Sequence, residues 1–112
     1  MQLAVTIYGL TREFPREGLN GLTSQMRRSV VSISSNIAEC QGRINAGECK
    51  QFLGIAHVSS YEVQTQLELA RELRLGDPKT IDSAENLSHQ VGKMIYALLE
   101  SLEVVRAPST EN

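Results

Sequence analysis

The sequence predicts an all-α protein, a single antiparallel four-helix bundle with up-down-up-down topology. Apolar residues recur at steps of three and four along four segments, which is the period of a helix face. Tryptophan is absent and aromatic residues make up only 4% of the chain, so the core is aliphatic, as suits helix packing. Short connections separate the segments and make consecutive helices antiparallel neighbours. We expect one domain over residues 1–106, since 112 residues is close to the commonest domain size.

The first predicted helix covers 2–13 and ends before Pro15, because proline disfavours helical geometry at the residue before it. The second covers 22–41, and Gly42 is its natural stop. Five serines lie in this second helix, and their small side chains favour close approach of a neighbouring helix. The apolar stripes are Leu3, Ile7, Leu10 and Phe14 in the first helix and Leu22, Met26, Val30, Ile33 and Ile37 in the second.

The third predicted helix covers 46–75. Asn45 and Glu48 have the spacing of a capping box, in which each side chain accepts a hydrogen bond from a backbone amide at the helix start. Gly76 is expected to end the helix. Its apolar stripe is Phe52, Ile55, Ala56, Ser59, Val63, Leu67, Ala70 and Leu73.

The fourth predicted helix covers 79–104, preceded by Asp77 as N-cap and Pro78 at the first helical position. Residues 107–112 are polar and are expected to form a disordered tail. The apolar stripe of this helix is Ile81, Ala84, Leu87, Val91, Met94, Ile95, Leu98 and Leu102.

The four helices differ in length. At a rise of 1.5 Å per residue the first spans roughly 18 Å and the third roughly 45 Å. The first helix therefore covers only part of the groove along its neighbours. We expect either a neighbouring subunit over the remainder or an N-terminal turn that this chain lacks.

Charge argues against a strongly basic nucleic-acid binder, because the formal net charge is −2. Residues 1–50 carry six basic and four acidic side chains, and residues 51–112 carry five and nine, so any anion-binding face belongs to the first two helices.

The start shows no signal peptide and nothing resembles a membrane span. We expect a cytoplasmic protein with no membrane partner.

No residue pattern specifies a reaction, so we expect neither an enzyme nor a cofactor, metal or small-molecule substrate. His57 and His89 lack the Glu-x-x-His spacing of di-metal bundles. Nothing is positioned to activate the serines of the second helix. Cys40 and Cys49 are expected to be reduced thiols, with a redox pair as the alternative.

Several segments together resemble one family. They are Leu10-Thr-Arg-Glu-Phe-Pro15, Gly21-Leu-Thr-Ser-Gln-Met-Arg-Arg28, Ser35-Asn-Ile-Ala-Glu39 with Gly42-Arg43, and Phe52-Leu53 with Ile55-Ala56, Ser59, Glu62 and Gln66-Leu67. In this order they are similar to the 23S rRNA-intervening sequence proteins, which are bacterial four-helix bundles. The chain departs from that pattern in lacking an N-terminal turn and in having Cys40-Gln41 where a glycine and an aromatic residue are usual.

The resemblance implies a ring-shaped homopentamer of unassigned role and no catalytic residues. A related branch, the accessory protein of diversity-generating retroelements, binds reverse transcriptase and nucleic acid. The first hypothesis is therefore a non-enzymatic, homo-oligomeric interaction module, whose main partner is another copy of the same chain. RNA, DNA or another protein is the further partner that the resemblance implies.

Three arginines, Arg27, Arg28 and Arg43, are the candidates for contact with nucleic acid or a partner, because guanidinium groups bind phosphate in bidentate fashion. The competing interpretation, which we favour, is an ion pair of Arg28 with Glu62 on the neighbouring helix. Asn36 and Glu39 are candidates for a polar seam that fixes packing register or a subunit contact.

Overall fold

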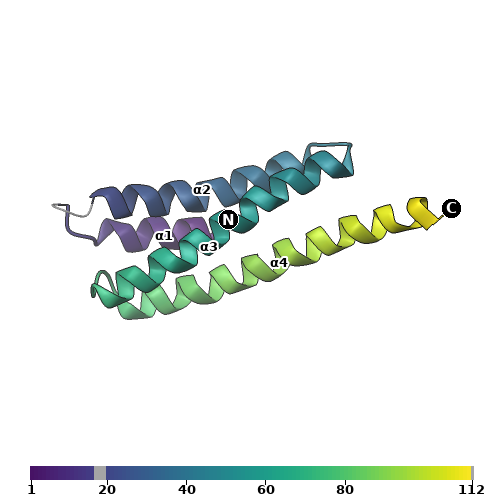
Figure 1. Cartoon of the computed structure of the whole chain (residues 1–112). Coiled ribbons are helices and arrows are strands. Elements are labelled where there is room, and N and C mark those ends of the chain that lie inside the picture. The colour runs from purple at the N-terminus through teal and green to yellow at the C-terminus, as the bar shows by residue number, and fades with distance from the viewer. Residues whose placement is uncertain (17–19, 112) are drawn as a thin grey trace.

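Four helices run alternately up and down in an elongated bundle, as predicted (Figure 1). The computed structural model describes residues 1–16 and 20–111, and side chains within 1–16 and 21–102. Each helix packs on the next along the chain, and the first also packs on the last. The helices are α1 (Gln2–Arg12), α2 (Asn20–Gln41), α3 (Ala46–Glu72) and α4 (Pro78–Glu111).

The start signals predicted from the sequence are confirmed at α3 and α4. The Asn45 side chain accepts hydrogen bonds from the amides of Gly47, at 2.7 Å, and Glu48, at 3.3 Å. Among the described residues the Asn45 amide does not donate to the Glu48 side chain, so only the Asn45 half of the capping box forms. Asp77 accepts from the Lys79 amide at 3.3 Å, and its carbonyl accepts from Ile81 at 3.0 Å.

The end of α3 comes earlier than the predicted residue 75. Arg74, at φ 58°, takes the left-handed conformation expected of a glycine that follows a helix. The Leu75 amide then donates to Ala70 at 2.9 Å, and the Arg74 amide donates to Arg71 at 3.1 Å. These two bonds form a Schellman motif, which satisfies carbonyls at the helix end. Gly76, at φ 71°, shapes the turn that follows.

The end of α4 comes later than the predicted residue 104. The helix continues to Glu111, through most of the segment 107–112 that we expected to be a disordered tail. Extending an existing helix by one residue costs far less than starting a new one. Since residues 103–107 contain neither glycine nor proline, nothing in them stops the helix. Residue 112 lies outside the described residues.

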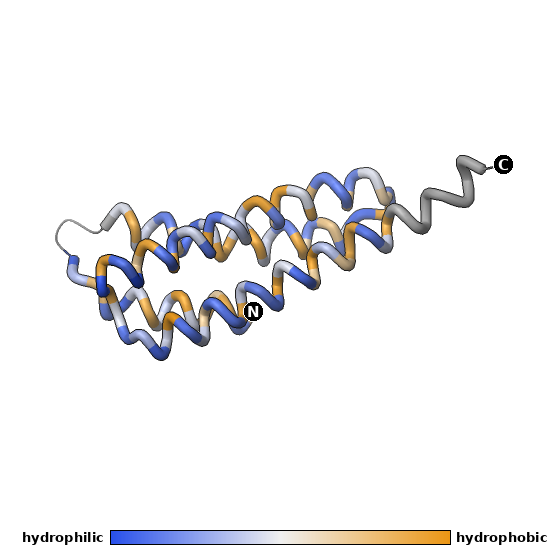
Figure 2. Tube along the Cα trace, turned by 60° about the horizontal axis from the view of Figure 1, so that its bottom comes forward, coloured by the Kyte–Doolittle hydropathy of each residue, from blue (hydrophilic) through white to orange (hydrophobic). Residues whose placement is uncertain are grey.

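The main core lies at the end of the bundle that α1 reaches. Leu3, Ile7 and Leu10 of α1 are almost fully buried against the three long helices. Beyond Met1, α2 and α3 stay side by side while α4 runs apart from them in the view of Figure 1. A separate small cluster forms there around Leu53, and Leu99 and Leu102 of α4 pack against it. Along every helix hydrophobic residues recur between hydrophilic ones (Figure 2). None of the helices in the described part of the chain combines the length and apolarity that a membrane span requires.

Cys40 and Cys49 form a disulfide, which corrects the expectation of two reduced thiols. The loop between α2 and α3 brings the two Cα atoms to 4.0 Å, a proximity that sequence spacing could not reveal. Both cysteines belong to the small cluster around Leu53. The disulfide therefore joins α2 to α3 at the end of the bundle that α1 does not reach.

Gly76 provides the first test of this packing. A Cβ atom at Gly76 would lie 2.5 Å from Leu10 Cδ1, and the positive φ adds backbone strain. We expect Gly76→Ala to lower the free energy of unfolding by about 2–4 kcal/mol, measured by urea denaturation. Gly54→Ala is the matched control, because nothing lies within 4 Å of a Cβ atom there. It should be neutral or stabilise by up to about 1 kcal/mol, and equal effects at both positions would contradict the packing.

The disulfide provides the second test. Its cysteines are separated by 9 residues, so in the chain-entropy estimate the crosslink contributes about 2.5 kcal/mol. We expect dithiothreitol to lower the urea midpoint of the oxidised protein correspondingly. The double variant Cys40→Ser, Cys49→Ser should match the reduced protein and ignore dithiothreitol. A native protein whose urea midpoint is unchanged by dithiothreitol would contradict the disulfide between Cys40 and Cys49.

Candidate functional site

Arg27 is held in a defined position between α1 and α2. Its Nε donates a hydrogen bond to Thr11 Oγ1 at 2.9 Å, and its guanidinium lies 4.7 Å from the centre of the Tyr8 ring. Thr11 is buried and donates its own hydroxyl proton to the Ile7 carbonyl at 2.8 Å. The Nε and one face of the guanidinium are therefore engaged. The terminal amino groups remain as donors in the fork geometry that suits phosphate or carboxylate.

Arg12 and Arg16 lie around the same pocket as Arg27. The pocket has a volume of about 340 Å³, and among the described residues no carboxylate belongs to its lining. Among the described residues no ion pair involves any of these three arginines, which we call the arginine cluster. Three guanidinium groups around one hollow are suited to bind an oxyanion. The lining consists of Thr11, Arg12, Phe14, Pro15, Arg16, Thr23 and Arg27.

The three arginines proposed from the sequence do not come together. Arg43 lies at the other end of α2, where it forms an ion pair with Glu39 at 2.7 Å. Its guanidinium also lies 5.0 Å from the centre of the Phe52 ring. Arg28 and Glu62 are both exposed, and within the described part of the chain no ion pair joins them. The structure thus groups Arg27 with residues of the first helix and the turn after it.

Arg12 and Arg16 were missed because they are isolated in the sequence. The usable signal was the short connection after Pro15, since an antiparallel hairpin places the end of the first helix beside the start of the second. Any cation in the last turn of α1 then faces the first turns of α2. This argument would have grouped Arg12 with Arg27 and set Arg43 apart.

The seam between α2 and α3 is polar and built from small residues. Asn36 donates to the Ser32 carbonyl at 2.8 Å and to Ser32 Oγ at 3.1 Å. Ser32 Oγ also accepts from Ser59 Oγ at 2.9 Å, across the two helices. Gln66 donates to Ser29 Oγ at 3.2 Å one turn away. The seam thus includes Asn36, whereas Glu39 points to Arg43 outside it.

Arg71 is the cation with the clearest structural partners. It bridges Asp82, at 2.6 Å, and Glu85, which places an ion-pair network on the surface between α3 and α4. Hydrogen bonds to Asp82 and then to Glu85 raise the pKa of Arg71 above its usual value. Because the group is exposed, the network contributes little to stability. Elsewhere in the described residues, no three side chains of His, Cys, Asp or Glu are grouped as metal ligands.

Comparisons with known proteins agree with this architecture. The chain resembles a solved protein of unknown function from the S23 ribosomal protein family of Bacteroides thetaiotaomicron, with a TM-score of 0.79. That match has 24% identity and covers 88% of this chain and 92% of the other, so it shows the fold alone. No curated protein matches the chain. A model of the family described as 23S rRNA-intervening sequence protein matches residues 1–97. This match spans most of the sequence, and the chain therefore belongs to the 23S rRNA-intervening sequence protein family.

Proposed function

We propose that this protein is a cytoplasmic, non-enzymatic interaction module that acts as a homo-oligomer, with five subunits in the ring. The observation that carries the proposal is the groove beyond the N-terminal end of α1. There Met1 is 45% exposed and Met94 is 44% exposed, although both lie between the long helices. The groove has a volume of about 280 Å³ and is lined by Met1, Ser34, Ile37, Ala38, Gln41 and Met94.

The character of this groove supports a protein occupant. Among the described residues its lining contains no charged side chain, and Ile37 packs against both clusters of the core. Methionine side chains are flexible and are common at protein interfaces. A helix from a second copy, seated in this groove, would cover both exposed methionines. Membership in the family is consistent with this role, since it assigns no reaction to the chain.

Substitution in the groove tests the proposal. We expect sedimentation velocity at micromolar concentration to give an oligomer for the native chain and smaller species for Met94→Glu, because a buried carboxylate at an apolar contact is unfavourable. Ser83→Glu, at an exposed position of the same helix, should retain the native oligomer. A native chain that sediments as a monomer would refute oligomerisation. An oligomer that Met94→Glu leaves intact would show that the groove is not the interface.

Binding of RNA or DNA is a second candidate function, and the arginine cluster supports it. Arg12, Arg16 and Arg27 present three guanidinium groups around a hollow whose described lining contains no carboxylate. Arg28 is exposed on the same helix as Arg27 and could extend the contact along a strand. Arg43 contributes less in this proposal, because Glu39 already neutralises it.

Arginine substitutions distinguish these contributions. We expect micromolar binding of a single-stranded oligonucleotide at low salt, with affinity falling as salt rises by a slope of about −0.7 for each phosphate contact. Arg12→Ala and Arg27→Ala should each weaken binding and reduce that slope in fluorescence anisotropy titrations. Arg43→Ala changes the net charge equally and should have little effect. No binding at low salt, or equal losses for all three variants, would reject the arginine cluster as the contact.

A further inference from the structure

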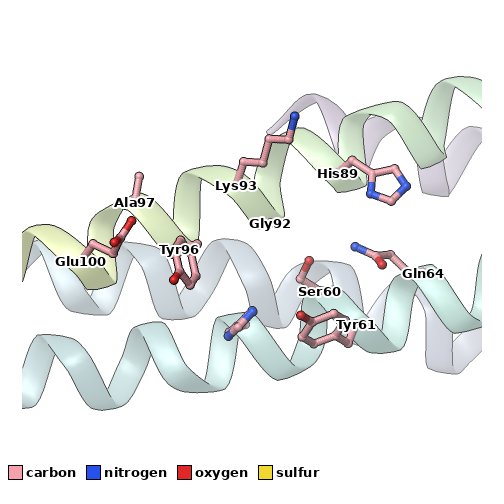
Figure 3. A pocket seen from close by; sticks show the side chains of 10 residues that line it. Ser60, Tyr61, Gln64, His89, Gly92, Lys93, Tyr96, Ala97 and Glu100 are labelled. Atoms are coloured by element: carbon pink, nitrogen blue, oxygen red, sulfur yellow. The ribbon is translucent and has the colours of Figure 1, made fainter.

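A cleft between α3 and α4 gathers most of the ring-bearing polar side chains of the chain. Both histidines and two of the three tyrosines line it, with His57 and Tyr61 on α3 and His89 and Tyr96 on α4 (Figure 3). The two pairs are far apart in the sequence and meet because α3 and α4 are antiparallel neighbours. The cleft has a volume of about 500 Å³, which is in the usual range for small-ligand sites.

The floor of the cleft carries polar groups that can form hydrogen bonds with a ligand. Ser60 is only 2% exposed, and among the described residues its hydroxyl has no hydrogen-bond partner. It points from α3 toward α4, opposite Gly92, and Gln64 lies beside it (Figure 3). A Cβ atom at Gly92 would lie 3.6 Å from Ser60 Oγ and 3.9 Å from Gln64 Nε2. The absence of a side chain at Gly92 therefore leaves the hydroxyl and the amide accessible.

The walls of the cleft provide aromatic surfaces. Tyr61 is 59% exposed and Tyr96 is 58% exposed, so both rings present a face to solvent. The His57 ring lies against Tyr61, with ring centres 4.9 Å apart. Tyr96 points from α4 toward α3 (Figure 3). Planar rings stack on such surfaces, and base stacking on aromatic side chains is tolerant of sequence.

We propose that this cleft binds a nucleobase that carries a phosphate. The base stacks on Tyr96 or Tyr61, and the Ser60 hydroxyl and Gln64 amide bond its polar edge, since both groups can donate and accept. The phosphate lies at the end of the cleft beside His89, whose imidazole can donate a hydrogen bond to it, and away from Glu100, which lines the opposite end (Figure 3). This site is separate from the arginine cluster and does not depend on the oligomer. A free nucleotide and a single strand of nucleic acid both present a base together with a phosphate.

Histidine resonances provide a direct readout. With two histidines in the chain, the imidazole carbon–proton signals can be assigned from His57→Gln and His89→Gln. We expect both signals of the full-length protein to shift saturably on titration with AMP or UMP. A ten-nucleotide single strand that binds at least tenfold more tightly than the mononucleotide identifies a strand as the source of the base. Equal affinity identifies a free nucleotide. No shift with either ligand at 10 mM overturns the proposal.

Matched variants locate the binding. Gly92→Leu fills the cleft and should weaken binding at least tenfold, whereas Gly54→Leu, with no neighbour near its Cβ atom, should not. Tyr96→Ala removes an exposed ring, so the fold should persist, and binding should fall about tenfold. Ile55→Ala is its control, because Ile55 is 50% exposed on α3 and belongs neither to the lining of the cleft nor to the arginine cluster. Binding that survives Gly92→Leu and Tyr96→Ala but is lost in Arg27→Ala would assign the ligand to the arginine cluster and overturn the proposal.

Discussion

The burial of α1 against the longer helices organises the rest of the molecule. Its 11 residues contribute Leu3, Ile7 and Leu10 to a core shared by all four helices. At the other end of the bundle α2, α3 and α4 pack without α1. The hydrophobic interior divides into two clusters there, and the smaller one contains the disulfide. The crosslink thus supports the region where helix packing is least complete.

The antiparallel arrangement explains where the polar sites lie. The hairpin between α1 and α2 brings Arg12 and Arg16 to Arg27, at the end where the core is complete. The pairing of α3 with α4 brings His57 and Tyr61 opposite His89 and Tyr96. The two sites lie on different helix pairs. The site of α1 and α2 has guanidinium groups, and the site of α3 and α4 has rings and a buried hydroxyl. The groove along α2 and α4 is a third surface, in which apolar side chains lie beside Ser34 and Gln41.

The four helices follow from the sequence because local signals determine them. The stripe from Leu3 to Leu10, the cap at Asn45 and the Asp77-Pro78 start are all visible within a few residues of the elements that they define. The end of α3 was less predictable, since Arg74 takes a conformation that its side chain disfavours, and the following Gly76 seemed the better stop. The extension of α4 to Glu111 was missed for a similar reason, because a polar composition does not itself end a helix.

The sites depend on contacts between distant residues, which periodicity does not reveal. Arg28 and Glu62 seemed natural partners, yet no ion pair joins them in the described part of the chain. Arg43 instead pairs with Glu39 near the end of α2, and Arg71 pairs with Asp82 and Glu85 between α3 and α4. The disulfide required the two cysteines to meet across a loop. The cleft between α3 and α4 was not anticipated, since its rings lie in two separate segments. Which residues face a groove depends on helix rotation, and small errors in rotation change the neighbours.

If another copy of the chain covers the groove beyond α1, backbone amides in the groove are protected only when subunits associate. Amide hydrogen exchange at two protein concentrations measures this protection. We expect peptides containing Ile37 and Met94 to exchange more slowly at micromolar than at nanomolar concentration. A peptide around the fully buried Val63 should exchange at the same rate in both. Exchange of the groove peptides that is independent of concentration, while the protein dissociates over the same range, would contradict the claim.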